Sequence, residues 1–593
     1  MKVLIFSHGG FFYLKTVNEN KLHYGKFTVR NENLDNMTKY QIIWRLLYLS
    51  LFMISPYGYT ENQLFPSTNE SIQFEQKQRL ESELTQRNLL EKHNVITVDD
   101  TFSKHGQDEI CFPVDKIQFV GATQLTSKTQ TKLTSPYLKH CLTLGEIHKL
   151  TKHVTNYYIE QGFITSQAII PEQDLSSHHL AIQMIEGKIE TIEIENSPKR
   201  LAHQIFPHQQ GKILNLRHIE QGLEQLNRLS SAKYTIDIQP GSQNGYSRII
   251  IHQQGKKWPI TGQLNFDNSG MKATGKQLIT GGLTVDSPLG FGEQWSVSAN
   301  TDMDGSTSHH NRYIVANVNV PYGYWSYRYQ FYRNSTLQPF YASGQQYRYE
   351  GKNTNQQFDV SRLIYRDGKQ RLTLQGSLKH KNARTQLASQ TLSISSPTLT
   401  SLSFTPQYST ALGQGYFTLN PAAEWGISAF GASPDTLAKD SPRSHYRKFS
   451  LSSSYQYFFA NGLTYLTSFY SQYSPDNLYG IERISIGGQY SVRGYHEQSL
   501  SGNRGGYWRN EINKDIANTA IGQLRFIGAL DYGFIASDTY HVEHDTLAGG
   551  AVGLSFTGNS PIYSQFLLSK PLHYPSQLKP DNWSAYWSVS FSL

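Results

Sequence analysis

Two short segments near the C-terminus combine charged residues with glycine in a way that could hold a buried ion pair. Val492-Arg493-Gly494-Tyr495 follows a glycine pair, which is typical of a sharply turning loop. Further on, a predicted strand places Asp531 and Gly533 on one face, opposite a face of large apolar side chains. If the loop folds toward that strand, the Arg493 guanidinium can meet the Asp531 carboxylate as a charge-assisted pair. A solvated turn and an ordinary acid remain the alternative at this point.

Other residues that could do chemistry are less promising. His178-His179 and His309-His310 could ligate a metal, but we find no matching carboxylate or cysteine nearby in the sequence. Polar loop residues are the better interpretation, so we expect no metal site. The sequence contains neither G-x-x-x-x-G-K-[ST] nor G-x-S-x-G. We therefore expect no catalytic residues, no cofactor and no enzymatic activity.

The two cysteines of the chain, Cys111 and Cys141, lie in the same small segment. An isolated pair in an exported protein predicts one disulfide, whereas two free thiols are the alternative. A bridge here would close a loop of about 30 residues and stabilise the segment by about 3 kcal/mol.

From about residue 260 to residue 593 the sequence alternates between apolar and polar side chains. In the segment 325–331, aromatic residues occupy every second position and Ser, Arg and Gln occupy the others. Lipid outside and a wet lumen inside require this pattern, so it predicts a membrane β-barrel of about 16 antiparallel strands. By length alone, twelve or eighteen strands fit almost as well. The 38 Tyr and 29 Phe suit the aromatic girdles of a barrel, although composition alone also allows a secreted β-sandwich lectin.

The segments ahead of the predicted barrel have a different character. A basic stretch and a short apolar run predict a signal peptide at 37–59, with 1–36 upstream of the true start. Residues 66–92 are rich in helix formers, with charges on all faces, and 93–110 form a predicted linker. Strand and helix signals then occur twice, which predicts two small α/β modules at 111–186 and 187–255.

Composition limits the classes of protein further. No run of 18 or more apolar residues follows residue 60, which excludes a helical transporter. The net charge is +8, but basic residues do not cluster with interleaved aromatics, so we expect no nucleic-acid partner.

The order of these motifs closely resembles the two-partner secretion transporters, the haemolysin and filamentous-haemagglutinin secretion/activation proteins of the Omp85 superfamily. The resemblance covers about residues 66–593 and rests on the Val492–Tyr495 loop, the Asp531-x-Gly533 strand, the two modules and the N-terminal helix. It implies a helix that plugs the pore, two periplasmic POTRA modules, a sixteen-stranded barrel, and Arg493 held against Asp531. The chain departs from the family at Ala529, where an aromatic is usual, and at the final Leu593, where Phe is usual.

The resemblance also implies a function. We expect a transporter of the Gram-negative outer membrane that translocates a large secreted β-helical haemolysin or adhesin, with activation of this client as an additional role. Its other partners would be outer-membrane lipid and the barrel assembly machinery, and it would work as a monomer. The client would add a strand to a sheet edge, around 233–252 in the second module. An Omp85-type insertase of other barrels is the alternative function.

Overall fold

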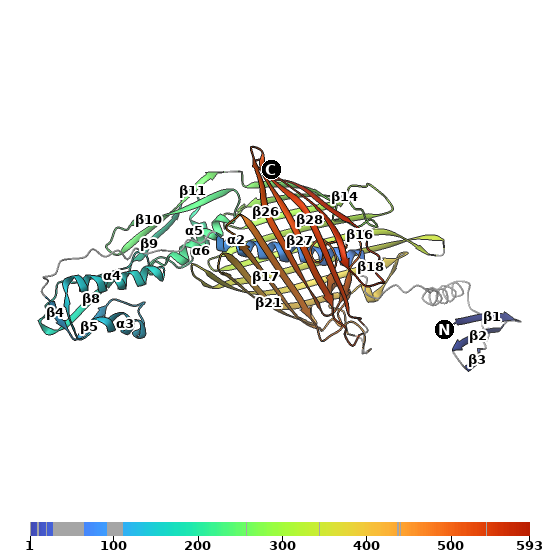
Figure 1. Ribbon diagram of the computed structural model, residues 1–593, viewed down its shortest axis with the longest axis horizontal. Helices are drawn as coiled ribbons and strands as arrows, with labels where there is room; N and C mark the ends of the chain where they lie inside the picture. Colours follow the sequence, from blue (N-terminus) through green and yellow to red (C-terminus); the bar gives the residue numbers. More distant parts are fainter. Residues whose placement is uncertain are drawn as a thin grey trace. The chain divides into compact units, whose positions relative to one another are not determined.

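The computed structural model (Figure 1) describes residues 65–91 and 111–592, apart from 257, 343, 436–437, 439 and 541, together with three strands near the N-terminus. The chain divides into two units, Met1–Thr60 and Glu61–Leu593. In the first unit, β1 (Lys2–His8), β2 (Phe11–Asn18) and β3 (Lys21–Phe27) form an antiparallel sheet. The predicted signal peptide at 37–59 and linker at 93–110 lie outside the described residues.

The first helix of the second unit, α2 (Pro66–Glu91), begins with a proline, whose fixed φ suits the first turn of a helix. Its buried residues are mostly polar or charged, and Ile72 and Leu90 are the apolar exceptions. A helix with so narrow an apolar face cannot be stabilised by packing into a hydrophobic core. Among the described residues, no helix is long and apolar enough to cross a membrane.

The first α/β module contains β4 (Cys111–Val114), β5 (Lys116–Val120), α3 (Ser127–Thr134), β6 (His140–Thr143), α4 (Leu144–Glu160), β7 (Gln167–Ile169) and β8 (His179–Ile185). Thr143 and Glu146 form a capping box that starts α4, and Leu150, Val154 and Tyr158 bury one face of this helix. The strand predicted over 111–121 is divided into β4 and β5. β4 pairs with β6, while β5 joins β8 and β7.

The second module contains β9 (Lys188–Ile194), α5 (Lys199–Ile205), α6 (Leu216–Asn227), β10 (Ala232–Pro240) and β11 (Tyr246–Lys256). Its strand order is β10-β11-β9, so β11 is central and β10 and β9 are the edges. Ile189, Leu226 and Ile249 belong to its buried core. The short helix α5 was not expected from the sequence.

The rest of the chain forms a closed antiparallel barrel in which the last strand pairs with the first. Its strands are β12 (Ile260–Asp267), β13 (Leu278–Asp286), β14 (Gln294–Asp302), β15 (His310–Tyr322), β16 (Trp325–Ala342), β17 (Gln345–Arg366), β18 (Gln370–Leu387), β19 (Gln390–Thr391), β20 (Thr398–Ala411), β21 (Gly415–Gly426), β22 (Arg447–Phe458), β23 (Leu463–Tyr473), β26 (Gly505–Thr519), β27 (Gly522–Ile535), β28 (Asp545–Gly558), β29 (Ile562–His573) and β30 (Ser584–Ser592). Because β19 is two residues long and β18 pairs directly with β20, the wall has sixteen strands. The predicted fold class is confirmed.

The barrel wall follows the predicted alternation. In β27, Phe526, Leu530 and Tyr532 are exposed on the outside, whereas Asp531 is buried on the inside. The lumen is occupied by α2 (Figure 1). Part of the long β23–β26 connection contacts this helix there, and the two together bury the inner polar residues.

The two ends of the barrel differ because the second module contacts only one of them. The Gln204 amide donates to the carbonyl of Pro321 at 2.6 Å, and Arg228 donates to the carbonyl of Gly292 at 2.7 Å. Both carbonyls lie beside strand turns at the end where β12 begins, which we call the module end. Since successive strands alternate in direction, the β23–β26 connection starts at the opposite, far end.

Candidate functional site in the barrel lumen

The β23–β26 connection folds back into the barrel instead of projecting from it. It contains the two-stranded sheet β24 (Ile484–Ile486) and β25 (Leu500–Gly502), and the segment between them carries the Val492–Tyr495 motif. Val492 and Tyr495 are buried in a cluster with Ile486, Leu500 and Tyr507. An apolar cluster inside a polar lumen gives this loop a core of its own.

Arg493, at the tip of this loop, is held by two carboxylates. Its Nε donates to Asp531 Oδ2 at 2.6 Å and its Nη2 donates to Asp531 Oδ1 at 2.7 Å, a bidentate pair. Its Nη1 donates to Glu511 Oε2 at 2.8 Å. The Arg493 backbone N–H also donates to Asp531, at 3.1 Å. The arginine is only 1% exposed, so removing either charge would leave the other buried without full compensation.

Glycines allow the loop backbone to approach the wall. A Cβ at Gly549 in β28 would lie 1.8 Å from the Arg493 carbonyl oxygen, and one at Gly533 would lie 2.8 Å from a Val492 methyl. Gly494 has a φ of +104°, which L side chains rarely adopt. The motif glycines therefore serve close packing of the loop against β27, β28 and β29.

The Tyr495 hydroxyl fixes the other side of the loop tip. It lies 2.7 Å from the carbonyl oxygen of Ala548 and 2.6 Å from that of His573, at the far ends of β28 and β29. Arg493 and Tyr495 thus bond to the wall on both sides of Gly494.

The structure brings Arg493, Asp531 and Gly533 into one site and adds residues that the sequence analysis did not assign. Glu511 supplies a second carboxylate, and Gly549 provides the space for the loop backbone. A signal for Glu511 was available, because exposed Trp508 and Ile512 set the outward register of β26. Glu511 also lies directly opposite Ala529, the position where the family usually has an aromatic.

Helix α2 lies beside this loop and is tied to it through the wall. The Lys381 ammonium of β18 lies 2.8 Å from Glu75 of α2 and 2.9 Å from Glu482 of the loop. Lys448 of β22 also pairs with Glu482, while Lys379 pairs with Glu424 at 2.8 Å. One lysine therefore links three parts of the lumen: the helix, the loop and the wall.

Neutral hydrogen bonds and ring contacts complete the seat of α2. Asn353 donates to the carbonyl of Ser67 at 2.7 Å near the far end, and Gln76 donates to the carbonyl of Ser485 at 2.8 Å. The Arg79 guanidinium lies 3.4 Å above the Tyr470 ring, and Phe74 stacks on another wall tyrosine. The helix is thus held mainly by polar contacts around its circumference.

Cys111 and Cys141 are joined by a disulfide in the first module. They lie on paired strands, since β4 and β6 run antiparallel and Cys141 faces Pro113 in the register. The bridge ties the start of the module to the strand between its two helices.

Comparison with known proteins identifies the chain. The family model described as haemolysin secretion/activation protein ShlB/FhaC/HecB matches residues 245–556, more than half of the sequence. The chain belongs to this family. Models of POTRA domains match residues 112–187, of the ShlB type, and 188–240.

Relatives cover most of the chain. The outer membrane transporter CdiB of Dickeya dadantii (strain 3937) is 36% identical over 546 residues, which is 90% of this chain and 97% of that protein. The hemolysin transporter protein HpmB of Proteus mirabilis is 30% identical, with 79% and 84% covered. The solved structure of CdiB from Escherichia coli has a TM-score of 0.85 at 36% identity and covers 90% of this chain and 100% of that chain.

These findings establish the class of protein. It is an outer-membrane transporter of two-partner secretion, which translocates a partner protein, and its POTRA modules are periplasmic. The module end of the barrel therefore faces the periplasm and the far end faces the outside of the cell.

Proposed function

We propose that the chain exports a large β-helical secreted protein of the haemolysin or adhesin kind, and that the Arg493 loop maintains the conduit for it. The observation that carries this proposal is the bidentate pair between Arg493 and Asp531, reinforced by Glu511. A loop tip fixed by a buried ion pair gives the lumen a defined inner surface while α2 occupies the remaining space.

The periplasmic modules supply the receiving surface in this proposal. β10 pairs only with β11 among the described strands, so its other edge can accept an extended client segment by strand addition. The β11 strand, which lay within the edge expected at 233–252, is central and offers no free edge. We therefore assign client docking to β10.

The proposed export needs no catalytic step and no cofactor from this chain. The relatives named above are transporters, and folding of the client outside the cell would draw it through the pore. One barrel encloses the complete loop site, which is consistent with a functional monomer assembled into outer-membrane lipid by the barrel assembly machinery.

Replacement of Arg493 tests the proposal. Arg493→Ala should reduce the amount of secreted client at least tenfold, because Asp531 and Glu511 lose their shared cation and the loop tip is released. Arg493→Lys keeps the charge but not the bidentate geometry. It should secrete an amount of client between that of Arg493→Ala and that of the wild type. Secretion is measured by immunoblot of the medium.

Heat-modifiable migration of the membrane protein provides the control, since a folded barrel migrates differently before and after boiling. Arg493→Ala should keep this behaviour while losing secretion. Normal secretion by a folded Arg493→Ala barrel would contradict the proposed role of the loop.

A further inference from the structure

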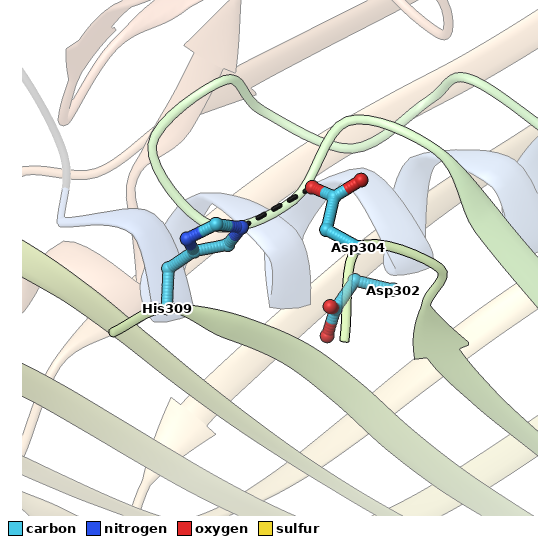
Figure 2. A group of neighbouring side chains, drawn as sticks. All are labelled: Asp302, Asp304 and His309. Carbon is cyan, nitrogen blue, oxygen red and sulfur yellow. Dashed lines mark hydrogen bonds and ion pairs between the residues drawn. The ribbon is translucent and has the colours of Figure 1, made fainter. Parts of the chain in front are cut away.

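A second group of side chains that could do chemistry lies at the far end of the barrel. Asp302 ends β14, and Asp304 and His309 follow in the β14–β15 loop. One potential ligand atom from each residue lies within 4.8 Å of the other two (Figure 2). The expectation that no carboxylate lies near His309 is wrong, because Asp302 and Asp304 lie beside it.

The Asp302 carboxylate lacks the cation that a buried acid requires. It is 7% exposed, and its Oδ2 accepts a hydrogen bond of 3.0 Å from the backbone N–H of Asn311. In the described part of the chain, Asp302 forms no ion pair with a Lys, Arg or His, and His310 interacts with it only at longer range. Burying an uncompensated carboxylate is costly, so proteins pair such groups or use them to coordinate metals.

His309 is oriented for coordination. Its Nε2 lies 3.2 Å from Asp304 Oδ2, as Figure 2 shows, and its Nδ1 lies 3.4 Å from the Ser308 hydroxyl. If Nδ1 carries the proton and donates to Ser308, the lone pair of Nε2 is free for a cation. Such hydrogen bonding by the other ring nitrogen is usual for histidines that bind metals.

We propose that Asp302, Asp304 and His309 bind a divalent transition-metal ion of the zinc class, with water in the remaining positions. Two carboxylates and one imidazole favour such an ion, whereas Ca²⁺ and Mg²⁺ prefer all-oxygen sites. Ligands bonded to zinc lie about 3.4 Å apart, so the short exposed loop would close slightly around the ion. The bound ion would also neutralise Asp302.

The location of the site gives the ion a neighbour in the lumen. Asn311 donates through its backbone to Asp302 and, through its side chain, to Glu70 of α2 at 2.9 Å. Asn311 thus connects a ligand of the proposed ion, Asp302, directly to Glu70 in the N-terminal part of α2.

Zinc binding to the purified full-length protein in detergent tests the proposal. After treatment with a chelator and dialysis, the protein is titrated with ZnSO₄ in a calorimeter. His309→Gln and Asp304→Asn should each weaken the tightest site at least tenfold. His178→Gln is the matched control, because that histidine pairs with Asp115 at 3.1 Å in the first module, and it should leave the site unchanged.

Two further measurements locate the ion and define its class. Crystals soaked in zinc should give an anomalous peak between the three side chains, and a hundredfold excess of Ca²⁺ should not displace it. Unchanged binding by a heat-modifiable His309→Gln barrel, an equal loss in His178→Gln, a peak elsewhere, or displacement by Ca²⁺ would each overturn the proposal.

Discussion

Gly549 illustrates how a single residue of the wall determines where the Arg493 loop can lie. The carbonyl of Arg493 passes so close to Gly549 that a methyl group there would lie 1.8 Å from its oxygen. The next residue, Gly550, is on the other face of β28. The nearest neighbours of a methyl group there would be the side chains of Leu530 and Leu572 at 3.4 Å and the backbone oxygen of Ala529 at 3.6 Å, which are ordinary contacts.

We expect Gly549→Ala to displace the loop and to lower client secretion by an amount similar to Arg493→Ala. The added methyl cannot be accommodated without moving the Arg493 backbone away from the wall. Protease accessibility of the loop from outside the cell, with secretion measured in parallel, checks this expectation.

Gly550→Ala is the matched control for this prediction. It has the same change in volume and in backbone entropy, but its methyl group faces lipid, so secretion and protease resistance should match the wild type. If the two variants secreted the same amount of client and were equally sensitive to protease, the close approach of the loop to Gly549 would not be needed for secretion.

At the residue scale, the sequence revealed the charged pair but not its complete environment. Arg493 and Asp531 could be proposed because a turn motif and a strand register can both be read from residue types. Glu511 and Gly549 were missed because their roles depend on which strands surround the folded loop, and this order is a tertiary property.

At the scale of elements, Lys381 is the residue through which the wall holds both the helix and the loop. Lys381→Ala removes two ion pairs at once. Since hydrogen bonds to charged groups contribute about 1.5–3 kcal/mol each, the population of channels without α2 in the lumen should rise about tenfold or more. Single-channel conductance in planar bilayers measures this population.

Lys379→Ala is the control for that experiment. Lys379 lies on the same strand and pairs with Glu424 of the wall at 2.8 Å, so its loss leaves the bridge between α2 and the loop intact. It should raise the open population less than Lys381→Ala does. The reverse order would argue against the lysine bridge as the retaining contact.

The disulfide acts at the level of the first module. Replacing Cys111 and Cys141 together by serine should lower the free energy of unfolding of this module by about 3 kcal/mol, because the unfolded chain gains the freedom of an open loop. Proteolysis of residues 111–186 in increasing urea, followed by mass spectrometry, reports the change. Two alkylatable thiols in non-reduced wild-type protein would contradict the bridge.

The elements themselves could be predicted unevenly. Long periodic segments, such as α4 and the barrel strands, were readable because burial on one face imposes a clear period. Helix α5 and strand β6 were missed, since elements of seven and four residues hold too few turns or alternations to show one. The position of α2 inside the barrel followed from family resemblance alone.

At the scale of the whole molecule, ion pairs fasten the second POTRA module to the barrel. Arg366 and Arg371, at the module ends of β17 and β18, both contact Glu224 of α6, and the Arg366 distance is 2.6 Å. Burial favours the neutral form of Glu224, but the two guanidinium groups outweigh burial and lower the pKa of this carboxyl below its ordinary value of 4.5.

The sign of this shift predicts a dependence on pH. A carboxyl whose pKa is lowered by docking stabilises the docked state above its ordinary pKa, and this stabilisation is lost as the pH falls through the lowered pKa. The module should therefore stay docked at neutral pH and loosen only after the pH has fallen below 4.5, the ordinary pKa of this carboxyl. Distances between spin labels on α6 and on the barrel wall check this prediction.

Glu224→Gln separates this contact from general acid effects. The variant lacks the titrating group, so it should show loosened docking already at neutral pH and little further change on acidification. A wild-type distance distribution that does not change with pH would contradict the proposed fastening.

The polar surface of α2 has a consequence for how the resting channel is governed. Because α2 is held by ion pairs and amide hydrogen bonds, its departure from the lumen would expose little apolar surface to water. The lumen lining that it leaves is also polar. The free energy of releasing α2 is therefore mainly that of separating charged and hydrogen-bonded groups, and exposure of apolar surface contributes little. The balance between sealed and vacant barrels should then depend on ionic strength and change little with agents that strengthen the hydrophobic effect.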